Sequence, residues 1–356
     1  MTAVADTRVN PRSEEVAVSN GAITATNARQ ALRVGQNRRS PAPEASTIAN
    51  DIPLIDVSAL WSPHGAARRG VAARIGLACR DVGFFAIEGH GVLAPLVADT
   101  FAASARFFAL PIDAKRVLAI GTLGGNRGYV GVGVEALDET TSADRKEALN
   151  LVWSDGRAMP ANVWPALPGF EDVVQRYFDA VLAVGRLLHT AFALDLGVDE
   201  AFFADKLDRP LATLRLLRYP ASDAAAPRDQ LGAGTHTDYG NVTLLATDGV
   251  AGLQVRRRDG RWIDAPATAG TFLCNIGDCL MRWTNDVYVS TPHRVVAPVA
   301  ERYSIALFVD PNPDAMVSAI ASCVADGDAP RHAPIRAADY LAQRFASTYG
   351  EGRREP

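Results

Sequence analysis

The sequence predicts an α+β fold in which a helical N-terminal half packs on a jelly-roll β core that is followed by a further helix. Apolar residues recur at helical spacing through the first half, most clearly from Phe170 to Phe192. After about residue 211 the pattern changes to short apolar runs of four to eight residues, broken by Gly, Pro, Asn and Asp. Many short strands with turn residues between them favour a sandwich or barrel.

The N-terminal half is expected to mix short strands with helices. The expected elements are a strand at 52–57, a helix ending at Gly83, a strand and turn at 84–91, a helix at 93–108, a loop at 121–133 and a long helix from Phe170 to Gly197. Glycine just after the last apolar position is a common helix stop signal. Glu171 and Asp172 near the start of the long helix suit the helix dipole.

The C-terminal half is expected to contain eight short strands. They are placed at 212–219, 242–247, 252–256, 262–264, 271–276, 279–283, 293–297 and 302–309. A last helix is expected near 336–348.

Four regions follow from these patterns. They are a disordered leader at 1–49, a helical region with short strands at 50–205, the β core at 206–315, and a C-terminal helix and tail at 316–356. The leader is rich in Ala, Ser, Asn, Thr and Arg, and it has too little apolar side chain to offset the entropy lost on ordering.

Composition narrows the class of protein. A formal net charge of −4 argues against general affinity for nucleic acid or for an anionic membrane. No apolar run is expected to reach the length that crosses a bilayer, and the N-terminus lacks the apolar core of a secretion signal. The four cysteines show neither CxxC spacing nor disulfide-framework density, so they are expected to be reduced thiols. A cytoplasmic location is the expectation.

A possible metal site lies in the run GTHTDYGNVTLL. His236 and Asp238 are two residues apart, so in an extended chain an imidazole and a carboxylate point to one face. His293 heads a later apolar strand, 55 residues after Asp238. Two histidines and one carboxylate form the facial triad that leaves open positions on Fe(II), although zinc with a water fits the same donors. The alternative is that His236 caps a turn and Asp238 hydrogen-bonds the loop backbone.

A second cluster follows in ERYSIALFVD. Arg302 and Ser304 share one strand face, which Ala306 and Phe308 continue. A buried arginine is costly unless it meets an anion, and a guanidinium beside a hydroxyl suits a carboxylate. A surface arginine that pairs with Glu301 or Asp310 is the alternative for Arg302 alone.

These residues resemble those of the iron- and 2-oxoglutarate-dependent oxygenases, in the branch similar to isopenicillin N synthase. Besides HTD…H…RYS, the landmarks are IPLIDVSAL, CRDVGFFAIEGHGV, RGYVG, WPALPGF, LRLLRYP, GLQV, NIGD and RYSIALFVDPNPD, and the likeness covers about residues 50–345.

The resemblance implies a double-stranded β-helix core and a specific chemistry. Fe(II) would be bound by His236, Asp238 and His293, with 2-oxoglutarate and O2 as co-substrates. Decarboxylation of 2-oxoglutarate to succinate would produce an iron-centred oxidant that abstracts hydrogen. By position, Arg302 and Ser304 match the residues that hold the distal carboxylate of 2-oxoglutarate, and Tyr219 matches a tyrosine that joins them.

The sequence also departs from the family pattern. Leu217 stands where many plant members have asparagine, and LRYP resembles isopenicillin N synthase, an iron oxidase that uses no 2-oxoglutarate. Against that oxidase, the tail TYGEGRREP lacks the glutamine near the end that resembles its extra iron ligand. A non-catalytic member that binds a small ligand is a further alternative, which an intact triad disfavours.

The expected partner is a small molecule that the enzyme hydroxylates, desaturates or cyclises, in natural-product or amino-acid metabolism. Arg127, Arg218 and Phe308 are candidate substrate residues, with surface ion pairing as the alternative for Arg218 and core packing for Phe308. The loops 121–150 and 221–233 are expected to choose the substrate. The sequence leaves the oligomeric state open.

Overall fold

Two β-sheets and a layer of helices form the part of the protein that carries the predicted site. The computed structural model describes residues 51–120, 126–138, 140–156, 161–222 and 230–349, without the side chains of 345–349. The expected disordered leader at 1–49 lies outside these residues.

The larger sheet has eight strands in the order β1-β2-β10-β7-β12-β5-β4-β3. Their bounds are β1 Leu54–Asp56, β2 Phe84–Glu88, β3 Gly128–Val130, β4 Glu147–Val152, β5 Thr213–Tyr219, β7 Val242–Thr247, β10 Phe272–Ile276 and β12 Arg302–Val309. All neighbours pair antiparallel except β1 and β2. Strands from both the 50–205 and the 206–315 regions therefore share one sheet.

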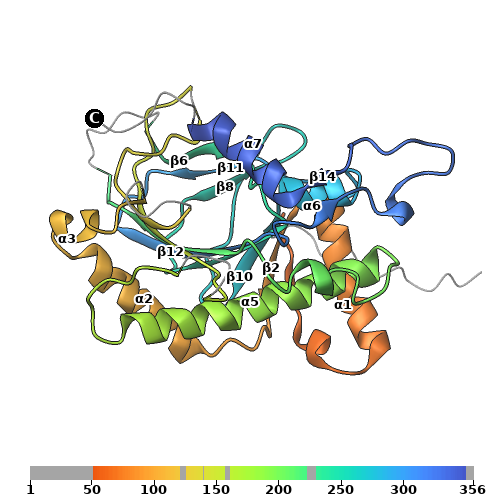
Figure 1. Ribbon diagram of the computed structural model, residues 1–356, viewed down its shortest axis with the longest axis horizontal. Helices are drawn as coiled ribbons and strands as arrows, with labels where there is room; N and C mark the ends of the chain where they lie inside the picture. The colour runs from red at the N-terminus through yellow and green to blue at the C-terminus, as the bar shows by residue number, and fades with distance from the viewer. Residues whose placement is uncertain (1–50, 121–125, 139, 157–160, 223–229, 350–356) are drawn as a thin grey trace, which may run out of the picture. The chain divides into compact units, whose positions relative to one another are not determined.

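The smaller sheet has four strands in the order β6-β11-β8-β9. Their bounds are β6 Leu231–His236, β8 Leu253–Arg256, β9 Trp262–Asp264 and β11 His293–Val296. Figure 1 shows β6, β11 and β8 lying across from β12 and β10, which is the jelly-roll arrangement. A further pair, β13 Met316–Val317 and β14 Ile335–Arg336, lies outside both sheets.

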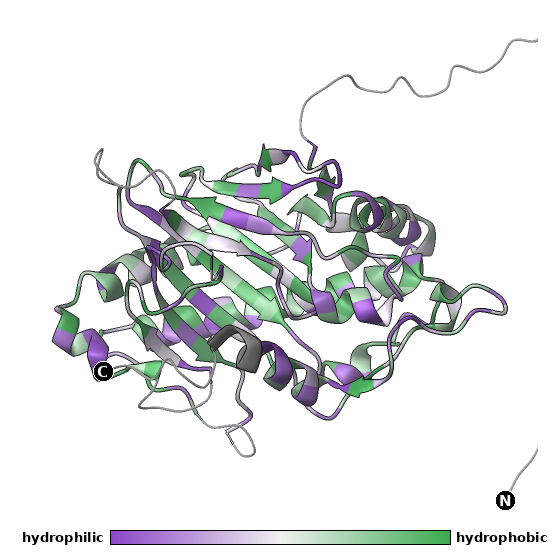
Figure 2. Ribbon diagram, turned by 90° about the horizontal axis from the view of Figure 1, so that it is seen from above, coloured by the Kyte–Doolittle hydropathy of each residue, from purple (hydrophilic) through white to green (hydrophobic). Residues whose placement is uncertain are grey.

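Alternate residues of strand β12 face the two sides of the larger sheet and belong to two different parts of the core. Ile305, Leu307 and Val309 belong to the core under the helices, whereas Ala306 and Phe308 pack with residues of the smaller sheet. Arg302 and Ser304 share the second face and line a cavity there. Coloured by hydropathy, the strands are mainly hydrophobic with hydrophilic segments among them (Figure 2). The predicted assignment of faces on this strand agrees with the structure.

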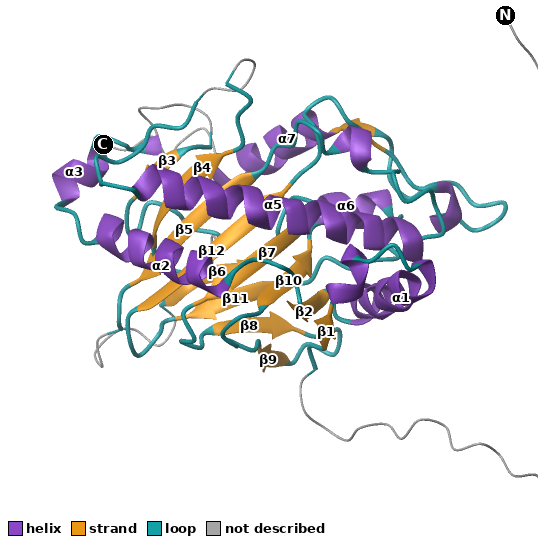
Figure 3. Ribbon diagram, turned by 90° about the horizontal axis from the view of Figure 1, so that it is seen from below, coloured by secondary structure: helices purple, strands orange, loops and turns teal. Residues whose placement is uncertain are grey.

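Helices α2 (Ala94–Phe108) and α5 (Phe170–Asp195) cover the other face of the larger sheet (Figure 3). The helices are α1 Gly65–Asp81, α2 Ala94–Phe108, α3 Ile112–Arg116, α5 Phe170–Asp195, α6 Asp278–Trp283 and α7 Ala337–Tyr349, with 3-10 turns at Ser58–Trp61, Ala204–Lys206 and Ala321–Cys323. Gly83 and Gly197, after α1 and α5, adopt φ of 69° and 70°, a conformation that favours glycine.

Helix α5 corrects the expectation that no apolar run reaches membrane-spanning length. By length and composition alone it could cross a bilayer, but 61% of its most apolar window is buried inside the protein. Its buried residues pack in the core between the helices and the larger sheet.

Three further expectations about elements are wrong. The segment 279–283 belongs to helix α6 and not to a strand, because Asp278 to Trp283 make a turn that buries Leu280 and Trp283. Residues 121–133 were expected to be a loop, yet Gly128–Val130 form β3. Strands β4 and β6 were absent from the expected list, although β4 lies between β3 and β5 and β6 carries His236.

Candidate metal centre

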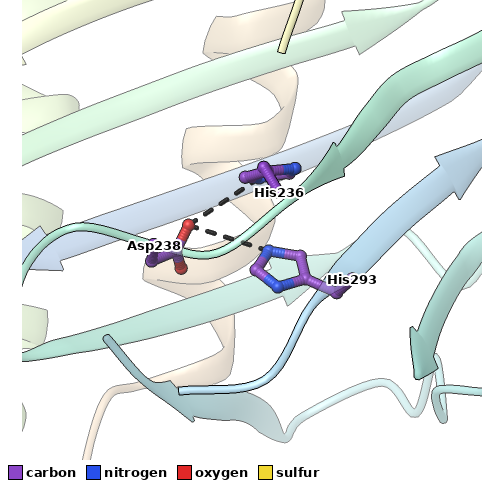
Figure 4. Close-up of side chains that lie close together, drawn as sticks. All are labelled: His236, Asp238 and His293. Atoms are coloured by element: carbon purple, nitrogen blue, oxygen red, sulfur yellow. Dashed lines mark ion pairs between the residues drawn. The ribbon is translucent and has the colours of Figure 1, made fainter. Parts of the chain in front are cut away.

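His236, Asp238 and His293 converge at one end of the two sheets. His236 is the last residue of β6, His293 is the first residue of β11, and the two are paired across the antiparallel ladder. Their ring centroids are therefore 4.3 Å apart. One potential ligand atom from each of the three residues lies within 4.8 Å of the other two, and Figure 4 shows the side chains pointing toward one another.

Asp238 reaches the site from a turn and not from the strand itself, since β6 ends at His236. The backbone oxygen of Asp238 accepts a hydrogen bond from Asp278 N at 2.8 Å, which ties this turn to the start of α6. Gly277 allows the close approach, because a Cβ there would lie 2.3 Å from the oxygen of Gly240. The glycine in NIGD therefore lets the backbone carry Asp238 into place.

Hydrogen bonds orient each ligand so that one atom faces the common point. Nδ1 of His236 lies 2.8 Å from Gly234 O, and Nδ1 of His293 lies 3.1 Å from Thr291 O. Asn275 Nδ2 donates to Asp238 Oδ2 at 2.7 Å, and Thr243 Oγ1 donates to the same oxygen. The two Nε2 atoms, 3.8 and 3.7 Å from Asp238 Oδ1, are left to face it.

This donor set fits a divalent metal ion. Backbone carbonyls on Nδ1 leave Nε2 as the free ligand nitrogen, and a hydrogen-bonded carboxylate keeps one oxygen for the metal. Burial and the neighbouring His293 lower the pKa of His236 to about 3. Burial opposes ionisation of Asp238, but both imidazoles and the donors Asn275 and Thr243 outweigh it and hold its pKa below the usual value. A neutral imidazole on His236 and an ionised carboxylate on Asp238 are the protonation states that bind a metal.

Arg302 lies in the same cavity as the three ligands, and this cavity has a volume of about 70 Å³. Arg302 and Ser304 are each 1% exposed, and Arg302 Nη1 lies 3.4 Å from Ser304 Oγ. The guanidinium carbon is 4.8 Å from the ring centre of Tyr219, its partner across the β12–β5 ladder. Within the described part of the chain, Arg302 forms no ion pair with a carboxylate. The geometry therefore suits an anionic ligand that reaches from the metal to Arg302.

A second cavity of about 100 Å³ adjoins the first and shares His236 and Asp238 with it. Its polar lining includes Asn126, Arg215 and Asp310, and Phe308 lines both cavities. Asp310 is 8% exposed, and its Oδ1 accepts no hydrogen bond from the described residues. Burial and the charge of Asp238 raise the pKa of Asp310 to about 7. This cavity combines hydrogen-bonding groups with an aromatic face.

Two candidate substrate residues do not reach these cavities. Arg218 lies on the helix-facing side of β5, where Nη1 donates to Glu147 at 2.7 Å and Nε donates to Glu301 at 2.7 Å. Ion pairing, the alternative expected for Arg218, therefore accounts for the position of this residue. Arg127 Nη1 donates to Ala161 O at 3.0 Å, and it is the adjacent Asn126 that lines the second cavity.

Several residues of the site were missing from the sequence-based list. Asn275 and Thr243 orient Asp238, and the sequence indicates Asn275 only as part of the NIGD landmark. Lys146 and Arg215 also line the cavity beside the metal ligands. Arg215 lies on β5, whereas Lys146 lies in the segment 121–150, where the sequence shows no pattern that predicts a site. The sequence feature that could have indicated Lys146 is the run ADRKE at 143–147, which places charges of both signs directly before an apolar strand.

Comparison with known proteins places the chain in a family. Residues 212–311 match the model of the 2OG-Fe(II) oxygenase superfamily, and residues 52–167 match the N-terminal model described as non-haem dioxygenase in morphine synthesis. The chain is 33% identical to the 2-oxoglutarate-Fe(II) type oxidoreductase hxnY of Emericella nidulans over 319 residues, 84% of this chain and 90% of that protein. A homoarginine-6-hydroxylase of Oryza sativa is 31% identical, with 84% and 97% covered.

Solved structures agree with this placement. Full-length T7H of Neurospora crassa in complex with alpha-KG has a TM-score of 0.79 and 34% identity, covering 85% of this chain and 98% of that one. A 2OG-Fe(II) oxygenase family protein of Caulobacter crescentus, described as putative, has a TM-score of 0.75 and 29% identity, with 84% and 99% covered. The chain belongs to the 2OG-Fe(II) oxygenase superfamily, and it is an Fe(II)- and 2-oxoglutarate-dependent dioxygenase.

Proposed function

We propose that His236, Asp238 and His293 hold the Fe(II), and that Arg302, Ser304 and Tyr219 hold the distal carboxylate of 2-oxoglutarate. The observation that carries this assignment is Arg302, a buried guanidinium that shares a cavity with the triad and pairs with no carboxylate of the described chain. Iron, 2-oxoglutarate and O2 together supply the oxidising power when bound. The chain's own residues orient these groups and shield them from water.

The cavity beside Arg302 also accounts for Leu217, which stands where many plant members of the family have asparagine. Leu217 and Ala306 line the apolar part of that cavity, so a carbon chain can lie there while its carboxylate meets Arg302 and Ser304. Relatives solved with 2-oxoglutarate or alpha-KG support this use of the site over the oxidase alternative.

The substrate that we propose is a small molecule bound in the second cavity, which it enters from the side of Asn126, Arg215 and Asp310. Phe308 provides an aromatic face there, so this candidate substrate residue stays in the proposal. Hydroxylation, desaturation and cyclisation are all compatible with this geometry. T7H has been solved with thymine, and a rice relative bears the name homoarginine-6-hydroxylase. Both compounds are small and polar, and both suit a first substrate panel.

The decisive experiment is an anaerobic titration of the Fe(II)-loaded protein with 2-oxoglutarate alone, followed by visible absorption. We expect a weak charge-transfer band that saturates, and succinate formation once O2 and an accepted substrate are added. Consumption of O2 with substrate in the absence of 2-oxoglutarate would contradict the proposal.

We also propose a cytoplasmic location. All four cysteines are free thiols, and Cys79, Cys274 and Cys279 are buried. Fractionation of the native producing cells, followed by immunoblotting, tests this point.

A further inference from the structure

Four charged side chains are buried together beside the metal centre. Glu135, Asp144 and Lys146 are 4%, 1% and 3% exposed, and the side chain of Arg215 is 13% exposed. Lys146 Nζ pairs with Asp144 and lies 3.2 Å from Glu135 Oε2. Arg215 Nη2 is 2.7 Å from both oxygens of Glu135. Among the described residues, the cluster therefore pairs two acids with two bases.

The two bases of the cluster stabilise the ionised form of Glu135. Burial alone would raise the pKa of Glu135, but the charges of Arg215 and Lys146 outweigh it and hold that pKa far below its usual value. A buried charge that loses its partner is strongly unfavourable, so each member keeps the others in place.

The cluster meets the metal centre at an irregularity in strand β6. His293 pairs with His236 and Val295 pairs with Ala233, so two residues of β6, Gly234 and Thr235, stand opposite one residue of β11. Such a bulge leaves a backbone group without its ladder partner and re-aims the side chains that follow. The Gly234 N–H instead donates to Asp144 Oδ1 at 2.8 Å, so a side chain replaces the missing strand contact.

The carbonyl of the same residue, Gly234, holds the proposed iron ligand. Gly234 O lies 2.8 Å from Nδ1 of His236, and that contact determines which ring nitrogen faces the metal. Gly234 also has to be glycine, since a Cβ there would lie 2.7 Å from the backbone nitrogen of Asp138. A continuous path therefore runs from Asp144 through the Gly234 backbone to His236.

We propose that Asp144 is a positioning residue for the iron ligand His236, and that Lys146, balanced by Glu135 and Arg215, keeps its carboxylate in place. This proposal rests on the proposed iron site and deepens it. Asp144 acts by holding the bulge of β6, so it orients the imidazole without touching the metal. Arg215 links the cluster to the second cavity, because it belongs to the cluster and also lines that cavity.

A matched control exists on the opposite face of the larger sheet. Lys115 is 6% exposed and pairs with Glu147 at 2.8 Å, in an ion pair that faces the helices and not the cavities. Lys146→Met and Lys115→Met therefore make the same substitution at similar burial. A purely structural role predicts similar effects of the two variants on iron binding.

The experiment measures the Kd for Fe(II) by anaerobic competition, the 2-oxoglutarate charge-transfer band and the melting temperature of the metal-free protein. Asp144→Ala and Lys146→Met are expected to weaken Fe(II) binding by roughly 10- to 100-fold and to shift the band. Asp144→Asn keeps an oxygen acceptor for Gly234, so it is expected to stay within about 3-fold of the wild type if that bond sets His236. Lys115→Met is expected to lower the melting temperature without changing the Kd.

Two results would overturn the proposal. One is an unchanged Kd in Lys146→Met, or a Kd change no larger than that of Lys115→Met. The other is an equal loss in Asp144→Asn and Asp144→Ala. If Asp144→Ala does not fold, the comparison of the Kd for Fe(II) between Lys146→Met and Lys115→Met still tests the proposal. A wild-type protein that binds neither Fe(II) nor 2-oxoglutarate would instead contradict the proposed function, so the two failures can be distinguished.

Discussion

The amide of Asn275 donates to Oδ2 of Asp238 at 2.7 Å, which leaves Oδ1 facing both imidazoles of the triad. Asn275 lies on β10 in the larger sheet, whereas both histidines lie on strands of the smaller sheet. A strand of the larger sheet therefore helps to orient the carboxylate ligand, which lies in the turn after β6 of the smaller sheet. Thr243, on the adjacent strand β7, donates to the same oxygen.

Asn275→Ala and Thr243→Val should each weaken Fe(II) binding by about 10-fold, because Asp238 loses a donor that keeps it ionised and oriented. Since both donors share Oδ2, the double variant should deviate from additivity. Anaerobic Fe(II) titration of the two single variants and the double variant measures this coupling. Unchanged affinity in all three would show that the carboxylate is oriented by other contacts.

His236→Ala, Asp238→Ala and His293→Ala should each abolish Fe(II)-dependent turnover, since one missing donor of three leaves the ion weakly held. Asp238→Asn should also fail, because it removes the negative charge as well as a ligand oxygen. His90→Ala is the control, since His90 is a buried histidine whose Nε2 lies 3.1 Å from Gly270 O and it belongs to another part of the fold. Metal content and succinate release measure the outcome, and near-normal activity in any triad variant contradicts the assignment.

Arg302→Ala should raise the Kd for 2-oxoglutarate sharply, because truncation of one partner of a buried charged pair costs roughly 2–5 kcal/mol. Arg302→Lys should restore only part of the affinity, as a point charge replaces the planar guanidinium. Arg294→Ala is the matched control, since Arg294 lies on β11 but stacks on Trp262 and bonds to Gln254. The charge-transfer titration reports the Kd, and equal values for Arg302→Ala and Arg294→Ala would rule out Arg302 as the anchor.

His189 should make the stability of the protein sensitive to acid. Burial lowers its pKa from 6.5 to about 4, while Asn241 Nδ2 lies 3.0 Å from its Nε2. Between pH 6.5 and 4 the unfolded chain therefore binds a proton at His189 that the folded chain does not bind. The contribution of neutral His189 to the free energy of unfolding is complete above pH 6.5 and is lost as the pH falls toward 4. The loss amounts to at most roughly 3 kcal/mol.

Urea unfolding of the metal-free protein at several pH values between 7.5 and 4.5 measures this effect. The metal-free wild type is compared with metal-free His189→Gln, so that His236 and His293 contribute equally to the pH dependence of both proteins. The difference between the two proteins should shrink as the pH falls. A constant difference across the range would assign the acid sensitivity to other groups.

Substitution of alanine for two helical glycines should change the free energy of unfolding in opposite directions. A Cβ at Gly185 in α5 would lie 2.8 Å from Val309 Cγ2 of β12, so Gly185→Ala should destabilise the fold by about 1–3 kcal/mol. Gly70 in α1 has no atom within 4 Å of such a Cβ, so Gly70→Ala should stabilise it by about 0.5–1 kcal/mol. Chemical denaturation measures both, and destabilisation by Gly70→Ala would contradict the open space around that helix.

The sequence by itself determined the parts of this protein that depend on local spacing. The period of two on β12 places Arg302 and Ser304 on one face, and the period of 3.6 places the helices α1, α2 and α5. The triad followed from donor chemistry together with the family resemblance. These signals are local because a side chain's direction in a strand or helix follows from its own backbone.

Only the tertiary structure decided the rest. The bulge in β6, the bond from Gly234 to Asp144, and the pairing of Arg215 with Glu135 each join residues about 60 to 90 positions apart. No periodicity encodes such a contact, because strand register and charge pairing depend on which distant segments meet. Arg218 shows the same limit: alternation predicts that it faces away from Tyr219, but only the fold brings Glu147 and Glu301 to it.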